Sequence, residues 1–437
     1  MNRSLPPEPR SPEPAPVIAA LEALSFGLAR LIEATAAAGH RLVLLTGDRG
    51  VYAHELAALP DTARAAFSVA DVDTTDTAAV RRVLTALPGL AGLINTTDTW
   101  SVPAADLAAE LGLPGPDPES VRLLRDKARV REALAAAGIG RGRAAVVAAG
   151  GAEEVLAATG LPAVLKDSSG TSSRGVWIVH DAEELRAALA EASLTALKGR
   201  LLAEPFLSGP LYSAETLSWA GRTRLLGVSS RLTSRTPAVR EEGAAFPVAL
   251  PAAEHDTVAA WAGRVLSAAG HDQGFAHVEF VLTAHGPELV EINRRIGGAL
   301  IGEALCRSLG VNVYEALVAV TLGRPPALLD GPAGVPGPAV AFVLVYPEVT
   351  GVLDGWTGIE GLAAFPGGVR WYPVREPGDA IGDIGDQRGC TGMVLAEAAT
   401  AELAQHRAWS AATTVRARMK PDPAAAEVVG GPAAGRG

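Results

Sequence analysis

Short apolar runs alternate with helical patterns along the first quarter of the chain. Apolar positions recur with a helical period over residues 27–38, 52–59 and 77–86. The apolar runs around them predict strands at residues 17–24, 41–46, 67–69 and 92–95. Strands that alternate with helices are typical of a parallel sheet. We therefore predict a parallel α/β domain over residues 16–115, after a Pro-rich, flexible tail at residues 1–15.

The pattern changes after residue 115. A helical pattern from Asp126 to Ala137 stops at Gly138 and predicts a connector, after which strands and helices mix as in a small α+β unit. Further strands are predicted at residues 201–204, 211–219, 223–230, 277–283 and 288–292, and helices at residues 256–269 and 300–309. A Pro/Gly-rich segment at residues 325–339 marks a boundary. The expected units are a connector helix with a small subdomain (116–200), a central subdomain (201–330), a C-terminal domain (331–420) and a flexible tail (421–437).

Length and composition place these units in a globular protein. The 437 residues correspond to roughly three domains, and 48% of them are hydrophobic. The net charge of -10 argues against nucleic acid, because phosphate binding needs clustered Lys and Arg. Cys306 and Cys390 lie far apart, which favours neither a disulfide framework nor a zinc site. We find no signal-peptide pattern and no run of about 20 apolar residues, so we expect a cytoplasmic protein without a membrane partner.

The strongest chemical signal is the segment 277–298, which reads as two strands joined by a tight turn at residues 285–287. Glu279 lies on one strand. Glu291, Asn293 and Arg295 follow at a spacing of two, so they point to the same face of an extended strand. Carboxylate and amide oxygens are ligands that Mg²⁺ takes when it also binds phosphates. The alternative is a solvent-facing strand of alternating charge, which is common in antiparallel sheets.

Two further segments have the composition of an anion and nucleotide site. In residues 161–179 a strand ends at Lys166, and a loop of small residues, 168–173, lets backbone N–H groups approach an anion. No helix beginning Gly-Lys-Ser/Thr follows, so this is not a P-loop, and a flexible Ser/Gly hairpin is the alternative. In residues 201–207 an apolar strand reaches Glu204 and turns at Phe206 and Leu207, where a purine ring could lie, although such residues are usually core.

In this order, the segments resemble the ATP-grasp superfamily of carboxylate-amine ligases over residues 16–420. The resemblance implies a Rossmann-like N-terminal domain, an ATP-grasp core of two subdomains that hold ATP between them, and a C-terminal lid. It also implies roles for individual residues: Lys127 and Lys166 contact phosphate; Ser168, Ser169, Gly170, Ser172, Ser173, Gly175 and Val176 form a phosphate loop; Glu204, Phe206 and Leu207 form the adenine hinge; Glu279, Glu291 and Asn293 bind Mg²⁺, or Mn²⁺ in its place; and Arg295 steadies an acyl phosphate.

Three stretches are similar to the L-amino-acid ligase branch, which makes dipeptides and amides: residues 72–76, 209–215 and 389–398. The chain departs from that branch at three positions. Leu211 replaces a hinge carboxylate that would contact ribose, Ala244 replaces a phosphate-contacting histidine and opens space, and Arg294 replaces a frequent proline. Glu242, Arg294, Gly297 and Gly298 are therefore candidates for contact with substrate or phosphate.

The resemblance implies a function. ATP would phosphorylate a small-molecule carboxylate, and a small-molecule amine would attack the acyl phosphate to form an amide. Two alternatives stay open: a bicarbonate-dependent carboxylase of the biotin-carboxylase type, and an ATP-binding protein without catalytic activity. A homodimer is compatible with the sequence, which identifies neither substrate.

Overall fold

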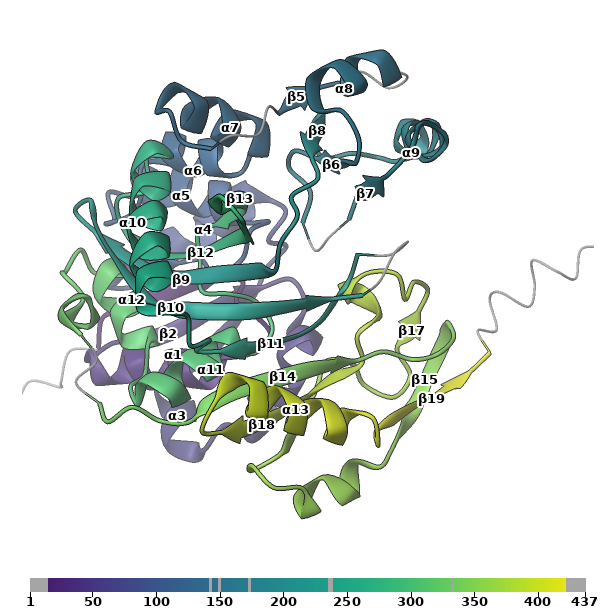
Figure 1. Ribbon diagram of the computed structural model, residues 1–437. Coiled ribbons are helices and arrows are strands. Elements are labelled where there is room, and N and C mark those ends of the chain that lie inside the picture. The colour runs from purple at the N-terminus through teal and green to yellow at the C-terminus, as the bar shows by residue number, and fades with distance from the viewer. Residues whose placement is uncertain are drawn as a thin grey trace, which may run out of the picture.

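The computed structural model describes residues 15–140, 144–147, 151–171, 174–234, 239–331 and 334–421 (Figure 1). Four sheets organise this part of the chain, with 4, 8, 3 and 4 strands. No helix in the described ranges is long and apolar enough to cross a membrane. The mixed α/β and α+β character expected from the sequence is confirmed.

The N-terminal sheet is parallel, with the strand order β3-β2-β1-β4. All five residues of β1 are buried, as expected when helices cover both faces of a parallel sheet. Strand β1 ends at Leu21, three residues before the predicted end, and α5 was not predicted. The elements are β1 (Val17–Leu21), α1 (Leu28–Ala37), β2 (Arg41–Thr46), α2 (Ala53–Ala58), α3 (Asp61–Ala65), β3 (Phe67–Asp71), α4 (Thr77–Ala86), β4 (Leu90–Ile94) and α5 (Ser101–Glu110).

Two helices, α6 (Pro118–Leu124) and α7 (Lys127–Ala136), lead from this domain to a small antiparallel sheet. Asp126 caps α7 by accepting hydrogen bonds from the backbone N–H groups of Ala128 and Arg129, which fixes the start of that helix. The sheet has the order β5-β8-β6-β7 and stands apart at the top of Figure 1. Its elements are β5 (Ala145–Val146), α8 (Ala152–Thr159), β6 (Ala163–Asp167), β7 (Val176–Val179), α9 (Ala182–Leu194) and β8 (Leu201–Pro205).

The largest sheet has eight antiparallel strands in the order β13-β12-β9-β10-β11-β14-β18-β16. It continues across the Pro/Gly-rich segment at 325–339, because β14 pairs with β11. Strand β11 was not predicted, since Glu, Gly and Ala have low strand propensity and pairing on both sides decides its conformation. The strands are β9 (Leu211–Trp219), β10 (Arg222–Thr233), β11 (Glu241–Phe246), β12 (Gly274–Thr283), β13 (Gly286–Asn293), β14 (Ala339–Val345), β16 (Arg370–Pro373) and β18 (Gly392–Ala398).

Helices and a small third sheet cover this large sheet. Helix α12, which was not predicted, packs against α1 and joins the N-terminal domain to the central part through a shared hydrophobic core. The third sheet has the order β17-β15-β19. These remaining elements are α10 (Ala252–Ala268), α11 (Ile301–Leu309), α12 (Tyr314–Thr321), α13 (Ala401–Ala412), β15 (Gly351–Thr357), β17 (Ala380–Ile381) and β19 (Arg416–Lys420).

Candidate active site

A cleft of about 270 Å³ lies between the small sheet and the large sheet. Its walls include residues from β6, β7 and β8 on one side and from β9, β10, β12 and β13 on the other. Twelve of the residues proposed from the sequence line it: Lys127, Lys166, Gly170, Val176, Glu204, Phe206, Leu207, Glu279, Glu291, Asn293, Arg295 and Gly298. Segments far apart in the sequence therefore meet at one place.

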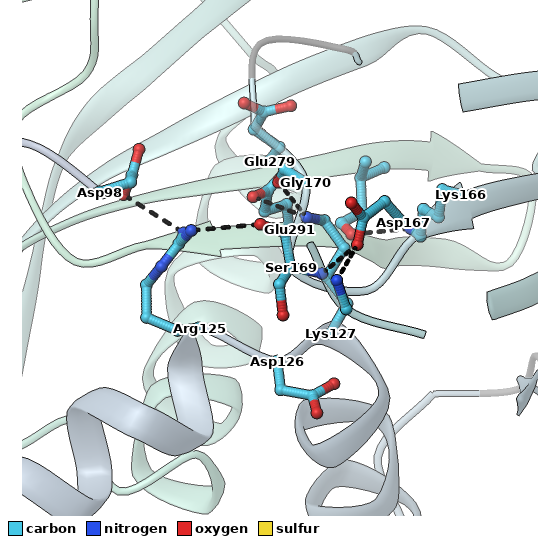
Figure 2. Close-up of polar contacts among 12 residues, drawn as sticks. Asp98, Arg125, Asp126, Lys127, Lys166, Asp167, Ser169, Gly170, Glu279 and Glu291 are labelled. Atoms are coloured by element: carbon cyan, nitrogen blue, oxygen red, sulfur yellow. Dashed lines mark hydrogen bonds and ion pairs between the residues drawn. The ribbon is translucent and has the colours of Figure 1, made fainter. Parts of the chain in front are cut away.

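Lys127 is buried in the cleft and is not the solvated helix lysine that its sequence context alone would suggest. Its backbone N–H donates to Ser168 O at 2.8 Å, which ties the start of α7 to the loop after β6. Its Nζ donates to Gly170 O at 2.8 Å and lies 3.1 Å from Glu291 Oε1 (Figure 2). Lys127 thus connects the small-residue loop to the carboxylate on β13.

Lys166 enters the cleft from the end of β6. Its Nζ contacts the carboxylate of Glu204 and donates to Val290 O at 3.2 Å. Arg131, on α7, contacts the same carboxylate and donates to the carbonyl oxygens of Leu289 and Val290. Burial would raise the pKa of Glu204, but Arg131 and Lys166 lower it to about 2. The carboxylate is therefore charged at neutral pH. Sequence analysis had missed Arg131.

The loop after β6 is held by Asp167. Its carboxylate accepts hydrogen bonds from the backbone N–H groups of Ser169, Lys198 and Gly199 at 2.7–2.9 Å. Ser168 is fully buried, and its Oγ accepts from Arg200 N. Of the proposed loop residues, Gly170 and Val176 face the cleft, whereas Ser168, Ser169 and Gly175 do not line it. Ser172 and Ser173 lie outside the described residues.

The residues proposed for the metal site converge at the junction of β12 and β13. Glu279 and Glu291 are direct cross-strand partners, and Asn293 lies two residues further along the same face. Burial would raise the pKa of Glu279, but Arg231 and His277 hold it well below its usual range. Within the described ranges, no group of three or more His, Cys, Asp or Glu forms a complete metal cage. Two carboxylates and one amide fit Mg²⁺ that takes its other ligands from phosphate and water.

A buried polar network behind Glu279 was not predicted. Glu215 lies opposite His277 on the neighbouring strand, and its carboxylate accepts from His277 Nδ1 at 2.9 Å. Arg231 Nη1 lies 2.8 Å from His277 Nε2 and 2.9 Å from Glu279 Oε1. The Nε of Arg231 lies 2.9 Å from Glu241 Oε1, but the N–H does not point at that oxygen, so the contact is an ion pair and not a hydrogen bond. The spacing of two between His277 and Glu279 could have indicated this network, because it places both side chains on the same face of the strand.

The protonation of His277 is tied to the position of Arg231. Burial lowers the pKa of His277, but the carboxylate of Glu215 outweighs this effect and raises it to about 9. A guanidinium can only donate, so Arg231 donates to Nε2 only when the ring is neutral with its proton on Nδ1 facing Glu215, whereas the raised pKa favours the protonated ring, in which Nε2 faces Glu279 Oε1 at 3.5 Å. Protonation of Nε2 would set two donors against each other and requires Arg231 to move.

Arg295 is held by a residue of the N-terminal domain that sequence analysis had missed. Asp98, in the loop after β4, accepts from Arg295 Nε at 2.8 Å and from Nη2 at 2.5 Å. Arg125 Nη1 lies 3.8 Å from the other oxygen of Asp98. Burial would raise the pKa of Asp98, but the positive charges of Arg295, Arg125 and Lys127 lower it. This pair joins the N-terminal domain to the metal-facing side of the cleft.

Three residues proposed to contact substrate or phosphate in the cleft do not line it. Glu242 points away and pairs with Arg240, while its neighbour Glu241 faces the cleft, because side chains alternate along β11. Gly297 packs against His277 and Ile301. Arg294 lines a second cavity, where burial lowers its pKa to about 10.

The space expected at Ala244 is also absent. Ala244 is fully buried in the hydrophobic core that the central sheet shares with the N-terminal domain, so it opens no room in the cleft. Ala244 pairs with Arg231 on one side and with Phe342, a member of the same core, on the other. Leu211, by contrast, does line the cleft.

Comparisons with known proteins agree with this architecture. Residues 159–303 match the ATP-grasp domain, and residues 343–420 match the L-amino acid ligase C-terminal domain 2. The uncharacterized protein y4rH of Sinorhizobium fredii is 28% identical over 368 residues, covering 82% of this chain and 73% of that protein. Carnosine synthase 1 of Gallus gallus is 30% identical over 264 residues, covering 54% of this chain but only 28% of that protein. An L-amino acid ligase from Bacillus licheniformis has a similar fold, with a TM-score of 0.77, 19% identity and coverage of 94% and 100% of the two chains.

The two-sheet cleft and the matched domain define the class: residues 159–303 form an ATP-grasp domain, and the chain shares its fold with ATP-grasp ligases. Within that superfamily it is related to the L-amino acid ligases, whose C-terminal domain it shares. The biotin carboxylase domain of a 2-oxoglutarate carboxylase from Hydrogenobacter thermophilus, which has a similar fold with a TM-score of 0.71 and 17% identity, has been solved in complex with MgADP. The family resemblance deduced from the sequence is thus confirmed.

Proposed function

We propose that the chain joins a small-molecule carboxylate to a small-molecule amine, with amino-acid-like compounds as substrates. The terminal phosphoryl group of ATP passes to the carboxylate, giving an acyl phosphate and ADP. The amine then attacks the acyl carbon, a proton is lost from nitrogen, and inorganic phosphate leaves. Such transfers depend mainly on positioning and on positive charge around the phosphoryl oxygens.

The observation that supports this proposal is the convergence of two lysines, two glutamates, one asparagine and one arginine in a single cleft. We assign Lys127 and Lys166 to the phosphates, with Gly170 and Val176 at the loop. Glu204, Phe206 and Leu207 would contact the adenine.

At the other end of the cleft, Glu279, Glu291 and Asn293 would hold Mg²⁺, which neutralises phosphate charge when bound. Arg295 would face the negative charge that develops on the acyl phosphate and its adduct, oriented by Asp98. Gly298 lies beside them and leaves room for a substrate.

The test is ATP-dependent release of phosphate from the full chain with pooled amino acids, followed by the mass of the product. We expect phosphate release that requires both an acid and an amine, and a product lighter than their sum by one water. Release that needs only bicarbonate would instead support a carboxylase. Binding of Mg·ATP without turnover across the pool would indicate a protein that has lost its activity.

Replacing a proposed metal ligand makes the test specific. Glu291→Gln should weaken binding of Mn²⁺ together with ATP, measured by electron paramagnetic resonance, and should lower turnover. Glu348→Gln is the matched control, because Glu348 is exposed and does not line the cleft. Equal Mn²⁺ affinity in both variants would contradict the assignment.

A further inference from the structure

A second cavity, of about 70 Å³, lies where the N-terminal domain meets the end of the large sheet. The loop after β4, helix α5, the start of β12, the segment after β13 and helix α12 enclose it. Most of its walls are apolar and include Leu93, Ile94, Phe275 and Ile296. At roughly 10–15 Å³ for one water-sized sphere, the space holds several heavy atoms, enough for a carboxylate with one or two methylene groups.

Arg294 brings a positive charge into this apolar space. Its Nη2 donates to the backbone oxygen of Gln273 at 2.9 Å. The carboxylate of Asp272 is near enough to raise the pKa of Arg294 and partly offset burial, but among the described residues no ion pair is formed with the guanidinium. Arg294 is half-buried, and a guanidinium has five N–H donors that favour an anionic partner where water is partly excluded. Arg294 therefore has donor capacity that one carbonyl does not satisfy.

Other polar groups at the cavity can assist an anion. Thr96 is 3% exposed, and its Oγ1 accepts a hydrogen bond from Leu24 N at 3.0 Å. A hydroxyl that accepts in this way keeps its own proton to donate. Gly274 lies beside the guanidinium, where a Cβ would come into ordinary van der Waals contact with Arg294 Nη2 at 3.6 Å.

The second cavity adjoins the proposed active site. Arg295 lines both cavities. The loop after β4 also contributes to both, with Asp98 in the first and Thr96 in the second. A substrate whose reacting carboxylate lies at Arg295 would thus have an apolar space beside it that ends in a separate cation.

We propose that this second cavity is a subsite for an anionic group, and that Arg294 binds a second carboxylate of one substrate. The inference rests on the proposed ligase function and deepens it, because it predicts a dicarboxylic amino acid or a related diacid as a preferred substrate. A free small anion would present the same chemistry to Arg294, and the experiment separates these two sources.

The test measures binding to the full chain by isothermal titration calorimetry, with Mg²⁺ and a non-hydrolysable ATP analogue present. L-glutamate and L-aspartate are compared with L-glutamine and L-asparagine, which have the same shape without the charge. We expect the acidic amino acids to bind about ten- to a hundredfold more tightly, as for a hydrogen bond to a charged group. Equal affinity of the acidic and neutral ligands would overturn the assignment to a substrate carboxylate.

Variants identify the residue responsible. Arg294→Gln should abolish the preference for acidic ligands while leaving the affinity for neutral ones, and Arg294→Lys should retain part of the preference. Arg324→Gln removes the same charge from an exposed site and should behave like the wild type. If Arg294→Gln does not fold, the wild-type ligand panel and Arg294→Lys still decide. A preference that survives in a folded Arg294→Gln would overturn the proposal.

Succinate and inorganic phosphate form the arm that tests a free anion. If they bind in an Arg294-dependent manner while acidic and neutral amino acids bind equally, the cavity is an effector site and the substrate assignment is wrong. These measurements need no turnover. If the preference for acidic ligands depends on Arg294 but no mixture of amino acids gives ATP-dependent phosphate release, the proposed ligase function is wrong and the proposed subsite is still supported.

Discussion

Replacing Arg295 by alanine should remove two separable contributions. Arg295 donates twice to one oxygen of Asp98 and once, from Nη1 at 3.1 Å, to Ile296 O. Without it, Asp98 keeps only the ion pair with Arg125 at 3.8 Å, and its side chain is only 12% exposed. Removing one partner of a buried ion pair costs roughly 3–5 kcal/mol, because a charge stays buried and unpaired.

The same change should affect catalysis independently of stability. Loss of one group that stabilises developing negative charge lowers turnover about a hundredfold to a thousandfold. In Arg295→Ala the unpaired carboxylate of Asp98 also lies beside the place proposed for the acyl phosphate, where it repels negative charge. We therefore expect the single variant to be both less stable and nearly inactive.

A double-mutant cycle with Asp98→Asn separates the two effects. The double variant no longer buries an unpaired carboxylate, so it should recover stability, with a coupling energy of about 0.5–3 kcal/mol between the two sites. Turnover should stay low, because the stabilising cation is still missing. The measurements are urea unfolding and kcat/KM from phosphate release. Wild-type turnover in Arg295→Ala, or strictly additive losses of stability, would refute this reasoning.

Three further results are expected. The pKa of Glu204 is depressed to about 2, so its ionised form contributes about 3 kcal/mol to the free energy of unfolding above its unfolded pKa near 4.5, and this contribution is lost as the pH falls toward 2. The urea midpoint should therefore drop less with falling pH in Glu204→Gln than in the wild type. Parallel plots of urea midpoint against pH would contradict this. Glu215→Gln removes the carboxylate that accepts from His277, and it should lower the free energy of unfolding by about 2–3 kcal/mol and weaken Mn²⁺ binding. Unchanged Mn²⁺ affinity would show that the network does not position the metal ligands. Gly297→Ala places a Cβ 2.7 Å from His277 Nδ1 and should reduce the free energy of unfolding by about 1–3 kcal/mol, which is measured as a lower melting temperature. Gly263→Ala is the control: nothing lies within 4 Å of its Cβ, so it should be neutral or stabilising.

Local periodicity was enough to predict much of the fold and one face of the site. The alternation of strands and helices identified the parallel N-terminal sheet. The spacing of two between Glu291, Asn293 and Arg295 placed them on the same face because side-chain direction in a strand depends only on position. The same rule gave a signal that was not used: Arg294, at an even position, faces a different cavity.

Other features depend on contacts that no local pattern contains. Asp98 and Arg295 are 197 positions apart and meet only when the N-terminal domain docks on the large sheet. Which of Glu241 and Glu242 faces the cleft depends on the register of β11 against β10 and β14. Arg131 carried no sequence signal, because its partners Glu204 and Val290 come from two different sheets.

The unbroken large sheet has a mechanical consequence. A movement that separated β14 from β11 would have to unzip a backbone ladder of four paired positions, which ties the C-terminal strands to the metal-facing ones. The small sheet faces this rigid base across the cleft through side-chain contacts such as Lys166 Nζ to Val290 O, each of which has a net worth of only about 1 kcal/mol. We therefore expect any opening of the cleft to occur between the small sheet and the large sheet, and to leave the spacing between Arg294 and Arg295 on the large-sheet side unchanged.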